Sequence, residues 1–509
     1  MSTVKRVFKN TMFLYLRMLI SIVFSFFTTR ILLQALGVSD FGLYNVIAGS
    51  VAMLGFFSAS MSSATQRFLS FAEGEGEIEK IKDIFANSVF LHRIIALVVT
   101  LFLVSIGFIL FNGALSIPNG RFVVAISVYG CMIISTIYAI TIAPYDAVLN
   151  ARENMRIYSF LGIFDVFAKL LIALSLLKCK CVDRLLFYGV LMAIESQAYR
   201  FLTKRYCILY YTDICYIGKT ININKKILFE IASFAGWNML NISTGMISLY
   251  GMGISINHFF GTVLNASLGI ASQVAGVLMG VSNNMTKALT PVLVKSEGRH
   301  EREKMINLSL TGCKYSFLLF SFLGFPIAFS IRPLLSLWLV EVPDYTEIFC
   351  ILLLFSTLIE QLFAFLFYSI NAHGNVRNYN ICRSVFNLLA VLVMCISFSM
   401  GFPAYHALLD WIIFKAVFGG LVNVYYAWRN FGLPIRSFFR LVLAPCLKTS
   451  LFVCVIMALL SPSDSDTLGI LVVRILAMFI LCLPIYWKVS MTKNERSLIY
   501  GIFKSKCNK

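Results

Sequence analysis

The sequence predicts an all-α polytopic membrane protein of about 14 transmembrane helices, built as two parallel six-helix lobes with an appended helix pair. Three observations predict this fold class: apolar runs of spanning length, basic residues concentrated in alternate loops, and an internal repeat. Hydrophobic residues make up 59% of the 509 residues and charged residues 13%. A soluble domain carries about 25% charge, so the composition excludes a soluble globular protein.

Apolar runs of about twenty residues recur along the chain, and each can cross a ~30 Å hydrocarbon core as a helix. The first run follows a short basic segment and lacks a small-residue cleavage site, so we expect it to be retained rather than removed as a signal peptide. The predicted spans are residues 10–35, 41–64, 89–111, 122–143, 158–177, 184–203, 231–256, 260–283, 314–337, 347–371, 381–402, 404–428, 438–460 and 467–487.

The distribution of basic residues predicts the topology. With a cytoplasmic N-terminus, the inside segments hold 33 of the Lys and Arg residues and the outside segments hold 5. This asymmetry follows the positive-inside rule and predicts that both termini are cytoplasmic. The formal charge of +19 is then explained by topology and anionic lipid headgroups, and we expect membrane lipids and no nucleic acid as partners.

The chain repeats itself at an offset of 221 residues. Residues 149–158 and 370–379 align without a gap, and the same offset aligns Phe13 and Leu19 with Phe234 and Leu240. The identical pairs are Asn150 with Asn371, Ala151 with Ala372, Asn154 with Asn375, Arg156 with Arg377, and Tyr158 with Tyr379. Six spans per repeat give two copies of the same orientation.

The repeat predicts three parts of the chain. They are an N-lobe over residues 1–220, a C-lobe over 221–430, and an appended helix pair with a basic cytoplasmic tail over 431–509. Two lobes of this kind are typical of alternating access, in which each lobe moves as a body around a site near the midplane.

Cations within the predicted spans are candidate substrate-binding residues. Arg17 lies on a polar helix face with Ser21, Ser25 and Thr28. A cation at the middle of a span costs about 2.5–3.5 kcal/mol, so Arg17 either binds an anion or extends to the headgroups. Arg30 lies nearer the outer boundary, where it either anchors the helix or contacts substrate.

Lys415 is the second substrate-binding candidate. Asp410 precedes it by five residues, a poor spacing for an ion pair on one helix. We therefore expect the partner of Lys415 across the cleft between the lobes.

Carboxylates within spans are candidate ion-coupling residues. Glu195 and Glu360 have no cation one helical turn away, which favours a proton or Na⁺ coupling role over an ion pair. Hydrogen bonding between helices is the alternative. Asp165 precedes Lys169 by one turn, so a local ion pair is expected beside any coupling role.

A second polar line runs along the predicted span 231–256. Trp237, Asn241, Thr244 and Ser248 share a helix face, and Asn238 lies beside it. Trp237, Asn238 and Asn241 are candidate contacts for a sugar or phosphate, and close helix packing in lipid is the alternative.

Nothing in the sequence indicates an enzyme. No P-loop is present, and the outside loop at residues 338–346 is too short for a catalytic domain. The 13 cysteines are scattered without metal-ligand spacing. We expect no metal site and no cofactor other than an H⁺ or Na⁺ coupling ion.

Five segments resemble turns of the Wzx-type polysaccharide (lipid-linked oligosaccharide) flippases of the multidrug/oligosaccharidyl-lipid/polysaccharide exporter superfamily. They are residues 36–44, 144–145, 150–158, 271–291 and 371–379. The resemblance implies a MATE-like V shape and a bacterial inner-membrane location. It also implies a role in O-antigen or capsule synthesis beside a polysaccharide polymerase and glycosyltransferases.

The function implied by the resemblance is transport of an undecaprenyl-diphosphate-linked repeat unit from the cytoplasmic to the periplasmic leaflet. The cleft cations would hold the diphosphate, Arg17 first and Lys415 second, while the polyprenyl tail stays in lipid. Three alternatives remain open: a multidrug or metabolite efflux antiporter of the same superfamily, a lipid II flippase, and a polysaccharide polymerase.

Overall fold

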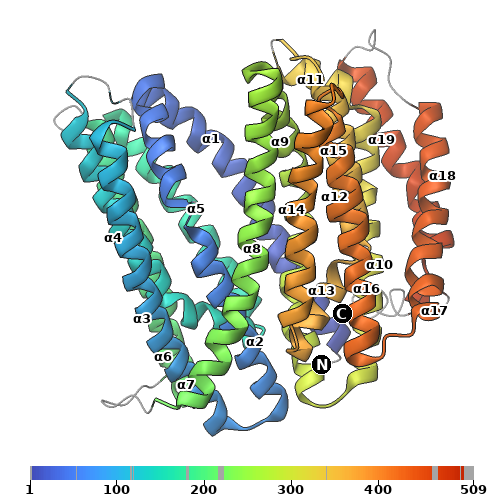
Figure 1. Ribbon diagram of the computed structural model, residues 1–509, viewed down its shortest axis with the longest axis horizontal. Helices are drawn as coiled ribbons and strands as arrows, with labels where there is room; N and C mark the ends of the chain where they lie inside the picture. The colour runs from blue at the N-terminus through green and yellow to red at the C-terminus, as the bar shows by residue number, and fades with distance from the viewer. Residues whose placement is uncertain are drawn as a thin grey trace, which may run out of the picture. The chain divides into compact units, whose positions relative to one another are not determined.

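The computed structural model describes residues 3–52, 54–114, 117, 120–178, 183–215, 223–339, 341–460, 468–492 and 495–497. Every regular element in these ranges is helical (Figure 1), which confirms the all-α prediction. The predicted boundary at residues 220/221 and most of the predicted basic tail lie outside the described residues.

The chain divides into two compact units. The first half is Arg6–Met239, and the second half is Leu240–Lys509 together with Met1–Lys5 at the start of the chain. The elements of the first half are α1 (Thr3–Ala52), α2 (Gly55–Glu75), α3 (Ile78–Ile109), the π-helix η1 (Leu110–Ala114), α4 (Phe122–Ala151), α5 (Met155–Lys178), α6 (Arg184–Tyr210) and α7 (Thr212–Cys215).

Helix α8 (Lys225–Phe260) crosses the division, and the second half continues to the appended helices. Its elements are α9 (Thr262–Gly298), α10 (Arg302–Phe329), α11 (Ile331–Trp338), α12 (Thr346–Gln361), α13 (Ala364–His373), α14 (Arg377–Ser399), α15 (His406–Trp411), η2 (Ile412–Phe418), α16 (Gly419–Phe431), α17 (Ile435–Phe438), η3 (Phe439–Leu443), α18 (Ala444–Leu460), α19 (Leu468–Ile485) and η4 (Tyr486–Ser490).

Long apolar helices account for most of the predicted spans. Among the described residues, 11 helices are long and apolar enough to cross a membrane, or up to 13 if each of two bent pairs is one span. The predicted span 184–203 forms part of α6 but is not among them, because Glu195 and Arg200 make this helix more polar. The protein is a multi-pass membrane protein.

Helix α1 contains the first bend. Gly37 has φ 77 and ψ 168, which interrupts the helix between two straight parts. Glycine adopts this left-handed φ without the steric cost that a Cβ adds. The second part of α1 and α2 then form one of the two bent pairs, with an angle of 46°.

The repeat seen in the sequence reappears in the local geometry of each half. The turn after α4 contains Glu153 with φ 55, and the turn after α13 contains Gly374 with φ 97, at the repeat offset. In the first half, the Nε of Arg152 lies 2.6 Å from the Oε1 of Glu73. In the second, the Nδ1 of His373 lies 3.1 Å from the Oε1 of Glu297. In each half, therefore, a side chain of this turn contacts a glutamate near the end of an earlier helix.

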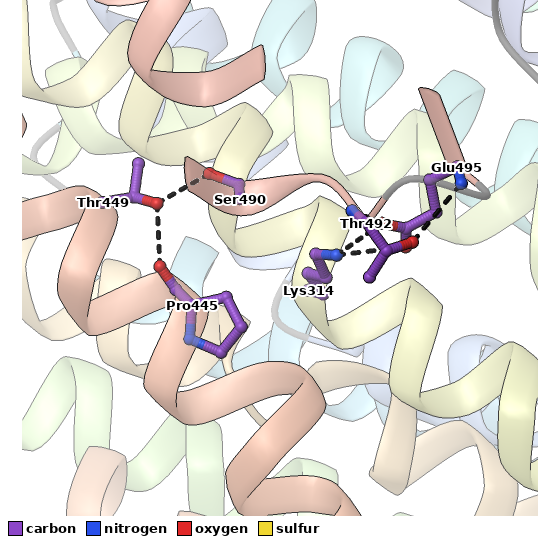
Figure 2. A network of polar contacts seen from close by, with 6 residues as sticks. All are labelled: Lys314, Pro445, Thr449, Ser490, Thr492 and Glu495. Atoms are coloured by element: carbon purple, nitrogen blue, oxygen red, sulfur yellow. Dashed lines mark hydrogen bonds and ion pairs between the residues drawn. The ribbon is translucent and has the colours of Figure 1, made fainter. Parts of the chain in front are cut away.

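The appended helices are fastened to α10. Helices α18 and α19, at the red end of the chain in Figure 1, pack against each other and against α10. Lys314 of α10 is buried, with 3% of its surface exposed. Its Nζ lies 3.0 and 2.8 Å from the two carboxylate oxygens of Glu495, which follows η4 (Figure 2).

Two further contacts hold the segment around η4 in place. The backbone N–H of Thr492 donates to Glu495 over 2.7 Å, and the hydroxyls of Thr449 and Ser490 are hydrogen-bonded at 2.6 Å (Figure 2). Lys314 lies inside α10, and its carboxylate partner is 181 residues away.

Glu495 is expected to stabilise the second half through this ion pair. Burial acts to raise the pKa of the Glu495 carboxyl, but the Lys314 ammonium and Thr492 outweigh it, and the net pKa is below its ordinary value. Glu495→Gln leaves the Lys314 ammonium buried without a carboxylate, at a cost of about 1–3 kcal/mol. We expect a lower thermal midpoint in detergent at pH 7, measured by tryptophan fluorescence.

The pH dependence and two controls test the same prediction. Since the pKa of Glu495 is lowered in the folded state, the stabilisation is complete above the ordinary Glu pKa of about 4.3. It is lost as the pH falls through the lower folded value, so the two proteins should converge in acid. Glu75→Gln, which breaks the ion pair with the 41% exposed Lys80, should cost little, and Lys314→Met should rescue Glu495→Gln. Equal midpoints for wild type and Glu495→Gln at pH 7 would contradict the prediction.

Candidate functional site

A polar cavity lies inside the first half. It has a volume of ≈420 Å³ and is lined by α1, α4, α5 and α6. Ligand pockets typically measure about 300–1,000 Å³, and this cavity falls within that range. The cavity brings together Arg17, Asp165 and Glu195, which were predicted from sequence, and adds Lys169 and Arg200.

Arg17 is held in the cavity by helix α5. Its guanidinium carbon lies 4.7 Å from the centroid of the Tyr158 ring. The guanidinium also lies against Gly162, where a Cβ would overlap its Nε and Cζ. Glycine at this position therefore leaves room for the guanidinium against the α5 backbone.

No carboxylate pairs with Arg17 in the part of the chain that the structure describes. It lies over an aromatic face and against the backbone at Gly162, which position a guanidinium but do not neutralise it. Because Arg17 lines the cavity, the structure favours the interpretation of Arg17 as a site residue over extension to the headgroups.

Two carboxyl groups lie side by side at the same cavity. Asp165 forms the expected one-turn ion pair with Lys169, at 2.9 Å. Glu195 of α6 is 7% exposed, lies within hydrogen-bonding reach of Asp165, and has a buried Oε1 with no hydrogen-bond partner. Two carboxylates this close repel each other when both are ionised, so the arrangement suits a shared proton.

The remaining predicted residues of the first half do not line this cavity. Arg30 is exposed on α1. Asn238 is 4% exposed on α8, and Trp237 on the same helix is partly buried. Asn241, in the second half, accepts a hydrogen bond from the Asn387 amide of α14 at 3.3 Å, as the packing alternative predicts.

A smaller polar pocket lies inside the second half. It has a volume of ≈150 Å³ and is lined by α9, α12, α13, α14, η2 and α16. The Nζ of Lys415 lies 3.8 Å from the Oε1 of Glu360 and 3.8 Å from the centroid of the Trp411 ring. The expectation of a partner for Lys415 across the cleft is wrong, because its carboxylate partner lies within the same half.

The sequence analysis missed several residues that shape the two pockets. Arg383 lines the pocket of the second half but was not predicted as a site residue. Gly162, Tyr158 and Arg200 were not identified as site residues. One signal was present: the 221-residue offset that aligns Tyr158 with Tyr379 also aligns Gly162 with Arg383.

Comparisons with known proteins identify the fold of the chain. No family model matches the sequence, and no curated protein matches it. The structure of a MATE protein in the bent conformation superposes with a TM-score of 0.68 at 12% identity, covering 89% of this chain and 98% of that one. The chain has the MATE fold.

Two further solved structures also superpose on this chain. The outward-facing conformation of a multidrug resistance MATE family transporter of the MOP superfamily gives a TM-score of 0.66 at 13% identity, covering 83% of this chain and 94% of that one. A MOP superfamily transporter from Pyrococcus furiosus Vc1 (DSM3638) gives 0.65 at 13% identity, covering 84% and 96%. Its binding pocket is described as having reversed polarity that suggests a different function.

The MATE fold confirms the fold class predicted from sequence. Its structural neighbours are transporters. At identities of 12 to 13%, the likeness is one of fold, and the cargo has to be argued from the residues of this chain.

Proposed function

We propose that the protein is a flippase. It moves an undecaprenyl-diphosphate-linked oligosaccharide repeat unit from the cytoplasmic to the periplasmic leaflet of a bacterial inner membrane by alternating access. The observation that carries the proposal is Arg17, a guanidinium in a membrane-embedded cavity with no carboxylate partner among the described residues.

The physical argument concerns the diphosphate. An anionic headgroup does not cross ~30 Å of hydrocarbon unaided, because burying an unpaired charge costs far more than thermal energy. The Arg17 guanidinium presents several N–H donors in one plane, a geometry that suits phosphate oxygens. Binding the diphosphate compensates the charge of the arginine and the charge of the cargo together.

The cavity volume limits which part of the cargo is bound. The ≈420 Å³ correspond to about fourteen waters at ~30 Å³ each. This volume suits a diphosphate and the first sugar rather than a complete oligosaccharide. Ser135, Thr136 and Ser196 line the same cavity and supply hydroxyls to a sugar, while the polyprenyl tail remains in lipid.

The carboxyl pair supplies a coupling site for the proposed transport. Asp165 and Glu195 are close enough to share one proton, and the Lys169 ammonium donates a hydrogen bond to Asp165. Glu360 suits this role less well because the Lys415 ammonium lies beside it. We therefore assign proton coupling to the first half, with Glu195 as the residue that gains and loses the proton.

The principal rival is multidrug efflux. Its cargoes are commonly cations, which favour acidic cavities. Here Lys169 is paired with Asp165 and Arg200 lies 4.0 Å from Asp146. Arg17 remains as the cavity cation without an ion pair among the described residues, which favours an anionic cargo, and a neighbour of the same fold with reversed pocket polarity is consistent with a change of cargo.

Replacing Arg17 tests the proposal. Arg17→Gln removes the cavity guanidinium and should abolish surface glycan in a flippase-null strain complemented with this chain, reducing display at least tenfold. Lipid-linked units should accumulate in the inner leaflet, because their synthesis does not need the flippase. Surface glycan is measured by gel and lectin blot, and leaflet location by accessibility to an added glycosidase.

Arg30→Gln is the matched control, since Arg30 lies on the same helix but is exposed outside the cavity. It should display glycan at the wild-type level, and all variants must reach equal membrane levels. A normal level of surface glycan in the Arg17→Gln strain would contradict the proposal. Glycan of single-unit length in the deletion strain would point to a polymerase, and drug sensitivity with normal glycan to an efflux pump.

Proton coupling is tested in vesicles. With reconstituted protein and a fluorescent short-chain polyprenyl-diphosphate sugar, an imposed pH gradient should speed flipping severalfold in the wild type. Glu195→Gln should flip at one rate with or without the gradient, because the amide cannot release a proton. Glu360→Gln should keep the response. A full response in Glu195→Gln would remove the carboxyl pair from coupling.

A further inference from the structure

The pocket of the second half is separate from the Arg17 cavity and has its own cations. We propose that it is a binding site for a singly charged phosphate-type oxyanion, held by Arg383 and Lys415. The site lies wholly within the second half, so it does not depend on Arg17 or on the identity of the cargo.

The charges of the pocket lining favour an anion. Three charged side chains line the pocket: Arg383, Lys415 and Glu360. Glu360 lies 3.8 Å from Lys415, which leaves the guanidinium of Arg383 as the uncompensated charge. In the described part of the chain Arg383 has no ion pair, and its Nε is buried without a hydrogen-bond partner. A membrane-embedded pocket with one net positive charge is stabilised by one negative charge.

The backbone around the pocket is shaped to position these two cations. A Cβ at Gly419, the first residue of α16, would overlap a terminal nitrogen of Arg383. The absence of a Cβ therefore leaves room for the guanidinium at this position. Lys415 lies in the π-helix η2, an irregularity that often marks functional positions in helices. The Trp411 ring covers one side of the Lys415 ammonium at 3.8 Å.

The internal repeat gives independent support. Gly162 and Arg383 occupy the same repeat position, four residues after Tyr158 and Tyr379 respectively. In the first half, the Arg17 guanidinium from α1 lies against Gly162 and over Tyr158. In the second half, the residue at the Gly162 position is itself an arginine, and its guanidinium lies against Gly419. Each half therefore holds a guanidinium against a glycine, and the repeat position supplies the glycine in the first half and the arginine in the second.

The volume identifies the class of ligand. The ≈150 Å³ accommodate one phosphate group. Asn283 and Thr286 line the same pocket and add neutral donors. A single net positive charge matches a phosphodiester or dihydrogen phosphate better than a dianion. Each phosphate of a diphosphate diester carries one such charge, so the ligand is either a lipid headgroup phosphate or free phosphate.

Trp411 provides a reporter for the test. In detergent-purified full-length protein, the other four of the 5 tryptophans are replaced by Phe, and Trp411 fluorescence is followed during titration with dimethyl phosphate at constant ionic strength in chloride. We expect a saturable change in fluorescence. Arg383→Gln and Lys415→Gln should each weaken the apparent affinity at least tenfold, and Arg17→Gln should leave it unchanged.

Further variants and probes decide the remaining outcomes. Gly419→Ala moves the guanidinium without changing any charge and should weaken binding severalfold, while thermal midpoints check that each variant is folded. A short-chain polyprenyl-diphosphate sugar and inorganic phosphate serve as competitors, and the one that displaces dimethyl phosphate more strongly is the physiological source. No saturable signal in the wild type, or an equal titration in Arg383→Gln, would overturn the proposal. Neither result bears on glycan export through Arg17.

Discussion

The cost of placing a cation inside a membrane protein governs the arrangement of this structure. Lys314, Lys415, Arg17 and Arg383 all lie in helices, and each needs protein, water or a ligand around its charge. Lys314 is buried against the carboxylate of Glu495, and Lys415 lies between Glu360 and Trp411. The Lys314 contact lies within the second half and holds α10 against the segment after η4, whereas Lys415 also lines the pocket of that half.

The two arginines are held in a different way. Arg17 and Arg383 each lie against a glycine backbone, Arg17 also lies over the Tyr158 ring, and neither has a carboxylate partner in the described residues. An aromatic face and a missing Cβ orient a guanidinium while leaving its N–H donors available. The same physical cost thus distinguishes Lys314, whose carboxylate partner completes a contact that stabilises the fold, from Arg17 and Arg383, which are available to an anion. Lys415 lines the same pocket as Arg383, so it belongs to the proposed binding site as well.

Sequence patterns predicted the helices and most of the spans because hydropathy is a property of neighbouring residues. The Asp165–Lys169 ion pair was also predictable, since its partners are one helical turn apart. The partners of Lys314 and Lys415 were not, because each lies on another helix far along the chain. Arg383 was overlooked because it lies near a helix start, where loop cations are also expected, and only the repeat offset connects it to Gly162.

We propose that the cavity of the first half is hydrated and positively charged. Ser135 lines this cavity, whereas its neighbour Ile134 on α4 is 55% exposed at the surface of the protein. In a cysteine-free background, we compare the rates at which Ser135→Cys and Ile134→Cys react in membranes with anionic and cationic methanethiosulfonate reagents. The account predicts reaction at Ser135→Cys alone, faster with the anionic reagent, and loss of that preference when Arg17→Gln is added. No reaction at Ser135→Cys, or a preference for the cationic reagent, would contradict it.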